Sequence, residues 1–204
     1  MIRNLIQLVS PYRPIRVSGT FWEKRYKDGA WDRLRTIEEL ARYSLIVGYV
    51  HYLNKGGSIL DVGCGEGILY ERLCKSNYSR YLGIDVSSVA IARACDKSNA
   101  TNQFLSTRIE DFRTDEKFDI IIFNECLYYM EEPLKTLRHY ESFLTKSGVF
   151  VISMYKTMGA WKVWKQFGNH YYIRDTVSVR NAKDECWTIK VLNRSMRNEP
   201  HPVS

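Results

Sequence analysis

The chain has 204 residues, of which 45% are hydrophobic and 26% are charged, a composition typical of one globular domain that folds without disulfides or a structural metal. No apolar run approaches the roughly 20 residues of a membrane-spanning helix, and the amino terminus lacks the small-residue cleavage site of a secretory signal. The five scattered cysteines have no metal-ligand spacing, which favours free thiols in a reducing, cytoplasmic compartment.

The formal net charge of +7 is unevenly distributed along the chain. Residues 1–55 and residues 156–204 each carry a net charge of +5, whereas residues 56–155 carry −3. The acidic centre suits a cationic cofactor, and the basic ends suit an anionic substrate. Basic side chains on a solvated surface would give the same distribution, so charge alone does not decide between these interpretations.

The amino-terminal third predicts helices. Residues 1–14 predict a short surface helix, with a membrane-touching helix as the alternative because an apolar face lies beside two arginines. Residues 19–34 concentrate Phe21, Trp22, Tyr26 and Trp31. A longer helix is expected to start at a capping box of Thr36 and Glu39 and to end near Asn54.

A buried strand is predicted at residues 58–62, and it runs into a glycine-rich turn at residues 63–67 and then a helix. Glycines in a turn between a strand and a helix allow a ligand to lie against the main chain, because no Cβ stands in the way. The glycines occupy the first, third and fifth positions, whereas a dinucleotide site needs a glycine at the sixth, which is Ile68 here.

Strands and helices continue to alternate after the turn. Strands are predicted at 81–84, 104–105, 118–125 and 149–155, and helices begin near Ser87 and at Pro133. Two segments of alternating polarity, joined by residues 181–185, then predict a β-hairpin. This order predicts an α/β fold, a doubly wound and mostly parallel sheet with an antiparallel C-terminal edge.

The glycine turn, with Asp61 two residues before it, resembles motif I of the class I S-adenosylmethionine-dependent methyltransferases. Three later segments match the same family in order: LGIDVSSVAIARA at 82–94, FLSTRIEDF at 104–112 and FNECLYYMEEP at 123–133. The last of them is similar to a stretch in nodulation N-methyltransferases and ubiquinone-type O-methyltransferases. The resemblance implies a Rossmann-like seven-stranded sheet, S-adenosyl-L-methionine as cofactor and no metal.

The resemblance also implies which residues hold the cofactor. Asp85 ends the second strand, where a carboxylate can accept both ribose hydroxyls. Arg108 stands where the family usually has an acidic adenine ligand, so the main chain of Ile109, or Glu110 or Asp111, is expected to replace it. The predicted cofactor-binding residues are Trp22, Asp61, Gly63, Cys64, Gly65, Gly67, Asp85, Val86, Ile109, Glu110 and Asn124.

Methyl transfer needs few catalytic groups, because the sulfonium already activates the methyl group and positioning lowers much of the barrier. Glu125 follows a central strand and is the first candidate for a proton acceptor, with an ion pair or a helix cap as its alternative role. Tyr128 and His170 complete the predicted catalytic set, and Tyr155 and His139 are further candidates. His170 is included because its segment usually receives the substrate in this family.

The predicted organisation is one methyltransferase domain followed by a flexible tail. The aromatic residues of 19–34 are expected to cover the cofactor like a lid, where they either contact the sulfonium through cation–π interactions or pack over the sheet edge. The domain is predicted to span residues 1–194, and residues 195–204 form the tail. Within the domain, residues 1–55 are the N-terminal lid and helices, residues 56–155 the cofactor-binding core, and residues 156–194 the substrate-side helix and C-terminal hairpin.

We therefore expect methyl transfer to an oxygen or nitrogen of a small, anionic or sugar-like metabolite by a monomer or homodimer. Short inserts leave no room for a macromolecule-binding domain. Two alternatives remain open. An RNA methyltransferase would explain the basic ends, although the stretch 124–127 lacks the Asn-Pro-Pro-Tyr pattern of enzymes that methylate base amino groups. A non-catalytic cofactor-binding partner protein would keep the glycine turn and Asp85.

Overall fold

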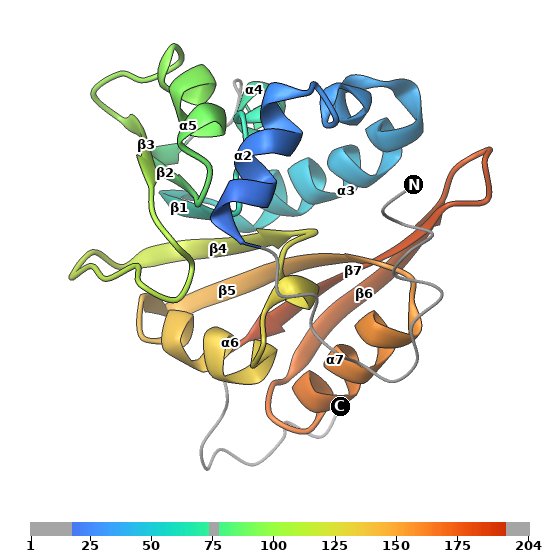
Figure 1. Cartoon of the computed structure of the whole chain (residues 1–204). Helices are drawn as coiled ribbons and strands as arrows, with labels where there is room; N and C mark the ends of the chain where they lie inside the picture. The colour runs from blue at the N-terminus through green and yellow to red at the C-terminus, as the bar shows by residue number, and fades with distance from the viewer. Residues whose placement is uncertain (1–17, 74–77, 195–204) are drawn as a thin grey trace.

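The computed structural model describes residues 18–73 and 78–194, and seven strands within these ranges form one sheet (Figure 1). The strand order is β3-β2-β1-β4-β5-β7-β6. The strands are β1 (Gly56–Val62), β2 (Tyr78–Asp85), β3 (Asn102–Ser106), β4 (Phe118–Asn124), β5 (Leu144–Tyr155), β6 (Ile173–Arg180) and β7 (Cys186–Asn193). Only β7 pairs antiparallel, with both β5 and β6, so the predicted Rossmann-like sheet with an antiparallel C-terminal hairpin is confirmed.

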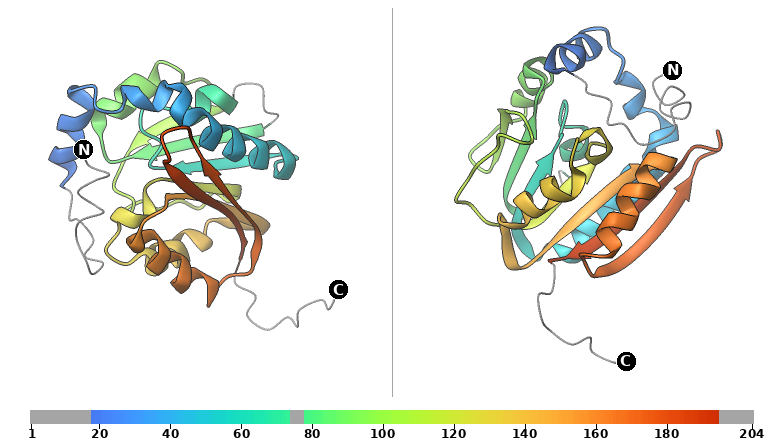
Figure 2. Two further views of the ribbon diagram at one scale, coloured as in Figure 1. Left: turned by 90° about the vertical axis from the view of Figure 1, so that its right-hand side faces the viewer. Right: turned by 60° about the horizontal axis from the view of Figure 1, so that its bottom comes forward.

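Helices cover both faces of the sheet (Figure 2). Helices α3, α4 and α5 bury Ile46, Leu69 and Ile91 against one face. Helices α6 and α7 bury Leu137 and Val163 against the other. The helices are α2 (Gly19–Lys27), η1 (Asp32–Arg35), α3 (Ile37–Leu53), α4 (Ile68–Leu73), α5 (Ser88–Cys95), η2 (Leu127–Tyr129), α6 (Pro133–Glu141) and α7 (Met158–Gly168).

The central strands are apolar because both of their faces are covered. In β1, Ile59 packs with α3 and α4, whereas Leu60 and Val62 pack with the layer that holds α6 and α7. Two predicted helix starts are confirmed, since the Ser87 side chain caps α5 and Pro133 opens α6. The predicted N-terminal surface helix and C-terminal tail lie outside the described residues.

The start of α3 corrects one prediction. Thr36 is the N-cap residue, but its hydroxyl donates to the main-chain oxygen of Arg33 at 2.7 Å instead of accepting from the helix. The Glu39 carboxylate, which is 1% exposed, accepts from the guanidinium groups of Arg33 and Arg42. Charge-assisted hydrogen bonds to two arginines are stronger than a reciprocal bond to a neutral amide, so the predicted capping box does not form.

Candidate functional site

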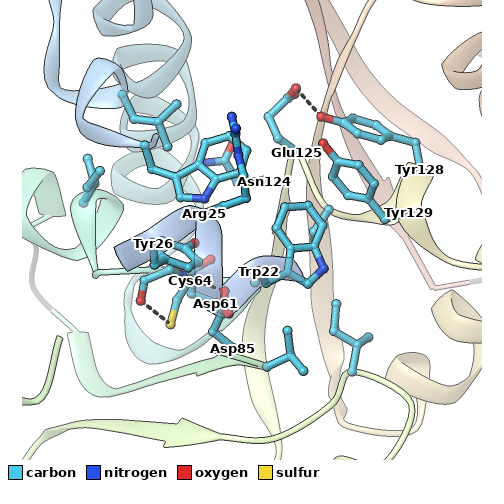
Figure 3. A pocket seen from close by; sticks show the side chains of 18 of the residues that line it. Trp22, Arg25, Tyr26, Asp61, Cys64, Asp85, Asn124, Glu125, Tyr128 and Tyr129 are labelled. Carbon is cyan, nitrogen blue, oxygen red and sulfur yellow. Dashed lines mark hydrogen bonds between the residues drawn. The ribbon is translucent and has the colours of Figure 1, made fainter. Parts of the chain in front are cut away.

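A cavity of about 910 Å³ opens at the carboxyl ends of β1, β2, β4 and β5 (Figure 3). Helix α2 contributes Trp22, Arg25 and Tyr26 to its lining, and the glycine turn and the residues after β4 contribute further lining residues. Ligands bind at this edge of parallel α/β sheets, because the crevice between diverging loops opens there. In the described part of the chain, no three His, Cys, Asp or Glu side chains are grouped to hold a metal ion.

The glycine turn forms the floor of the cavity. Its main chain is anchored because the Gly63 and Cys64 amides both donate to the main-chain oxygen of Ile84, at 2.8 and 3.0 Å. Gly65 has a φ of +56°, and a Cβ there would lie 2.6 Å from the Tyr26 hydroxyl oxygen. Because Gly65 has no Cβ, the Tyr26 side chain of α2 lies directly against the main chain of the turn.

Gly63 and Gly67 serve different purposes. A Cβ on Gly63 would lie 2.9 Å from the Cβ of Cys126, so this glycine allows the turns after β1 and β4 to approach each other. A Cβ on Gly67 would lie 3.3 Å from the Phe104 ring. Gly67 is not among the residues that line the cavity, and the lack of a Cβ there allows the turn to pack against Phe104 of β3 and Ala94 of α5.

Asp61 ends up almost fully buried beneath the cavity. Its Oδ2 accepts a 2.7 Å hydrogen bond from the hydroxyl of Tyr81, whereas its Oδ1 has no hydrogen-bond partner among the described residues. Burial, together with the nearby Asp85, raises the pKa of this carboxyl from an ordinary value of 3.8 to about 7, although the hydrogen bond from Tyr81 lowers it. A buried carboxylate oxygen without a donor indicates a site for a cationic or hydrogen-bonding ligand.

Asp85 is held by the main chain at the end of β2. Its Oδ2 accepts from the Gly65 amide at 3.0 Å, and its Oδ1 accepts from the Ser87 amide at 2.9 Å. Burial raises its pKa to about 6, although these two hydrogen bonds lower it. The carboxylate is therefore fixed beside the glycine turn, and Val86 next to it also lines the cavity.

Aromatic rings enclose the cavity between α2 and the segment after β4. The Trp22 ring stacks on Trp31 with centroids 5.9 Å apart and meets the edge of Tyr129 at 4.9 Å. Trp22 therefore packs against other rings and also lines the cavity, where its contact with the sulfonium stays a prediction.

A buried arginine reaches the end of β4 from helix α3. Arg42 is 1% exposed, pairs with the Glu39 carboxylate at 2.9 Å, and donates from Nη1 to the side-chain oxygen of Asn124. Burial lowers the pKa of this guanidinium, but its neighbours Tyr43, Glu125 and Glu39 raise it overall, so Arg42 is charged. It sets the orientation of Asn124, a predicted cofactor-binding residue.

Glu125 is the centre of a hydrogen-bond network. Its backbone lies in the left-handed region with a φ of 63°, held by a 3.0 Å bond from its amide to the main-chain oxygen of Ser153. Its carboxylate accepts from the Ser153 hydroxyl at 3.0 Å, from the Tyr128 hydroxyl at 2.9 Å and from the Tyr155 amide at 3.1 Å. Strained backbone of this kind persists where the surroundings fix it, often at functional sites.

The remaining predicted residues divide between the cavity and the surface. Ile109 and Glu110 line the cavity together with Arg108, which pairs with Glu110 at 3.7 Å and with Asp111 at 3.6 Å. His170, by contrast, is exposed after α7 and contacts Arg138, outside the cavity, so the prediction of a catalytic role for it is corrected.

The sequence pattern does not single out the arginines of the cavity lining. Arg25, Arg33 and Arg42 all line it, although their spacing in the sequence is that of ordinary charged residues on helices. His139, one of the further candidates for a proton acceptor, binds the main-chain oxygen of Phe112 at 2.9 Å and does not line the cavity.

The comparisons with known proteins agree with this geometry. A family model described as a methyltransferase domain matches residues 28–186. A ubiquinone biosynthesis O-methyltransferase from Actinobacillus pleuropneumoniae serotype 7 is 35% identical over 48% of this chain and 45% of its own length. A malonyl-[acyl-carrier protein] O-methyltransferase from Bacillus cereus is 27% identical over 90% of this chain and 63% of its own length. The chain spans about half the length of the ubiquinone-type relatives that it matches.

Solved structures show the same fold. The N-methyltransferase NodS from Bradyrhizobium japonicum WM9, in complex with S-adenosyl-L-homocysteine, superimposes with a TM-score of 0.71 at 22% identity, covering 82% of this chain and 92% of NodS. No helix in the described ranges is long and apolar enough to cross a membrane. The family model covers more than half of the chain and the sheet order and glycine turn agree with it, so the chain belongs to the class I S-adenosylmethionine-dependent methyltransferases.

Proposed function

We propose that this chain is an enzyme that transfers a methyl group from S-adenosyl-L-methionine to an oxygen or nitrogen of a small, sugar-like acceptor. The observation that carries the proposal is the buried Oδ1 of Asp61, which has no hydrogen-bond partner among the described residues and belongs to a residue that lines the cavity next to the glycine turn. A cavity of about 910 Å³ is at the upper end of the range for small-molecule sites, which supports room for a cofactor and an acceptor together.

The residues at the turn fit the functional groups of the cofactor. The ammonium group of its methionine end would satisfy Asp61 Oδ1, which has no donor among the described residues. Asp85 would accept the ribose hydroxyls, since main-chain amides already fix the position of its carboxylate. The guanidinium groups of Arg33 and Arg42, which line the cavity, suit the cofactor's carboxylate.

When bound, the cofactor supplies a methyl group on a positively charged sulfur, which an oxygen or nitrogen nucleophile can take. The protein's own residues would hold the acceptor and receive its proton. The Tyr128 hydroxyl donates to Glu125 at 2.9 Å and also contacts the Tyr129 side chain, so one lone pair of its oxygen would accept the proton of an acceptor O–H or N–H. The Tyr128 proton would then move to Glu125 Oε2. Trp22 and Tyr129 would exclude water from this end of the cavity.

The charge of the lining beyond β4 supports a sugar-like acceptor over an anionic one. The described lining residues after Asn124 include the carboxylates Glu125, Glu131 and Glu185 and no lysine or arginine. A phosphate or carboxylate there would meet charge repulsion, whereas hydroxyl and amino groups can donate to carboxylates. The rings of Tyr128 and Tyr155 offer flat surfaces of the kind that sugars pack against.

The test is turnover with a defined panel of acceptors. Conversion of the cofactor to S-adenosyl-L-homocysteine would be followed by mass spectrometry with amino sugars, polyols and phenols in one set, and carboxylates and phosphates in another. We expect activity in the first set. Tight cofactor binding without turnover in either set would contradict the proposal, and turnover on tRNA or rRNA fragments would favour the alternative of an RNA methyltransferase.

A further inference from the structure

A tyrosine on β2 lies under the turn and holds Asp61 in place. Tyr81 is fully buried, and its hydroxyl donates to Asp61 Oδ2 at 2.7 Å. In the sheet register, Asp61 lies opposite Gly83, and Tyr81 lies opposite Ile59. Since alternate residues share a face of the sheet, Tyr81 and Asp61 are diagonal neighbours on one face. Gly83 has no side chain that could separate them.

The ring of Tyr81 is fixed by its neighbours. Its centroid lies 5.1 Å from that of Tyr70, 6.1 Å from that of Tyr78 and 5.8 Å from that of Phe104. Packed rings allow little movement, so the Tyr81 hydroxyl stays directed at Asp61. One carboxylate oxygen is therefore occupied, and the other has no partner in the described part of the chain and belongs to a residue that lines the cavity.

We propose that Tyr81 is a positioning residue for the methionine end of the cofactor: by holding Oδ2 of Asp61 it keeps Oδ1 directed at the cofactor's ammonium group. The inference rests on the proposed function, because it needs a cofactor with that group. A hydrogen bond to the ionised carboxylate lowers the pKa of Asp61 against the effect of burial. Tyr81 therefore also keeps a larger fraction of Asp61 charged.

The test compares two ligands that differ at the methionine end. S-adenosyl-L-homocysteine carries the ammonium group, whereas 5′-methylthioadenosine shares the adenosine and the sulfur but has no amino acid end. Titration calorimetry near neutral pH would measure both ligands with the wild-type protein and with Tyr81→Phe, which keeps the ring. We expect Tyr81→Phe to weaken the binding of S-adenosyl-L-homocysteine about tenfold and to leave the binding of 5′-methylthioadenosine unchanged.

Tyr70→Phe is the matched control. Tyr70 belongs to the same ring cluster, but its hydroxyl accepts from the Asn102 side chain at 2.9 Å and does not contact Asp61. We expect this variant to bind both ligands like the wild type. Thermal melting of each variant would show that the fold is retained.

A double-mutant cycle separates the inference from general damage. In an Asp61→Asn background, Tyr81→Phe should have no further effect on the affinity for S-adenosyl-L-homocysteine. If Tyr81→Phe weakened the binding of both ligands equally, or of neither, the inference would be overturned. Failure of the wild-type protein to bind S-adenosyl-L-homocysteine would instead overturn the proposed function.

Discussion

The carboxylate of Glu23 accepts a 2.7 Å hydrogen bond from the main-chain amide of Ser88, and so ties helix α2 to the start of helix α5. The same carboxylate accepts from the Ser88 hydroxyl at 2.9 Å and from the Val89 amide at 3.3 Å. A negative charge at a helix N-terminus is favourable, because the free amides there carry partial positive charge. Helix α2, which supplies Trp22 and Tyr26 to the cavity, is therefore anchored beside Asp85.

Removing this anchor should speed the release of the cofactor. We expect Glu23→Ala to raise the dissociation rate of S-adenosyl-L-homocysteine about tenfold, because α2 then opens more often. Stopped-flow fluorescence would follow the change through Trp22 and Trp31. Lys27→Ala is the matched control, since Lys27 lies on the same helix and is exposed. An unchanged release rate in Glu23→Ala would show that α2 does not limit release.

The glycine turn gives a second prediction. Gly65→Ala should abolish measurable cofactor binding, because its Cβ would lie 2.6 Å from the Tyr26 hydroxyl and would displace main chain and side chain that both line the cavity. Its left-handed φ of +56° should also cost about 1–2 kcal/mol of stability. Calorimetry and thermal melting would measure the two effects.

The control for Gly65 is a glycine on helix α3. A Cβ on Gly48 would meet no atom within 4 Å beyond its chain neighbours and its own helix backbone, so Gly48→Ala should bind the cofactor normally and gain up to about 1 kcal/mol of stability. Normal cofactor binding by Gly65→Ala would show that the ligand does not lie against this turn.

Local signals explain what could be predicted from the sequence. The glycine turn and Asp85 are predictable because strand, turn and acidic residue follow one another within about 25 residues, which is a local pattern. The sheet followed from the alternation of apolar strands and helices, because each element's periodicity reports the face that it buries.

Tertiary contacts explain what could not be predicted. Arg42 and Asn124 are 82 residues apart in the sequence, and an arginine on a helix has the pattern of a solvated residue until the fold buries it. The same applies to Tyr81, whose apolar surroundings hide the role of its hydroxyl. His170 lies outside the cavity because the chain turns away after α7, where the His170 amide donates to the main-chain oxygen of Phe167.

Asp61 should make the stability of the unliganded protein depend on pH. Its pKa is about 7 in the folded protein and near 3.8 when unfolded, so the folded state binds the proton more tightly. The contribution of protonated Asp61 to the stability of the fold is therefore fully present below about pH 4 and is lost as the pH rises through about 7. Asparagine does not titrate, so the Asp61→Asn variant does not lose this stability. Its free energy of unfolding, compared with that of the wild type, should increase by on the order of 2–4 kcal/mol as the pH rises from about 4 to about 8.

Thermal or urea unfolding at several pH values would measure this effect. The groups that act on the pKa of Asp61 are Tyr81, which lowers it, and Asp85, which raises it, and the Asp61 carboxylate in turn raises the pKa of Cys64 and of Cys126. Asp85, with a pKa of about 6, shifts stability in the same direction, so Asp85→Asn shows which part of the slope belongs to which carboxyl. If the stability gained by Asp61→Asn did not vary with pH, the pH dependence would not arise from the Asp61 carboxyl.

The network around Glu125 gives the prediction that bears most directly on catalysis. Tyr128→Phe removes the hydroxyl that donates to Glu125 Oε2, and Glu125→Gln removes the group that would receive the proton. Each should lower kcat about 100-fold, the lower end of the contribution of a general base, while the KM for the cofactor changes little. Steady-state kinetics with the acceptor identified by the panel would measure both parameters.

A second tyrosine–glutamate pair supplies the control for this experiment. The Tyr171 hydroxyl donates to Glu141 Oε2 at 3.1 Å, and neither residue lines the cavity. Tyr171→Phe removes the same kind of hydrogen bond, so it should change stability by about 1 kcal/mol and leave kcat within about twofold. If Tyr128→Phe were as active as Tyr171→Phe, the hydroxyl of Tyr128 would have no part in proton transfer, and positioning of the two substrates alone would have to supply the rate.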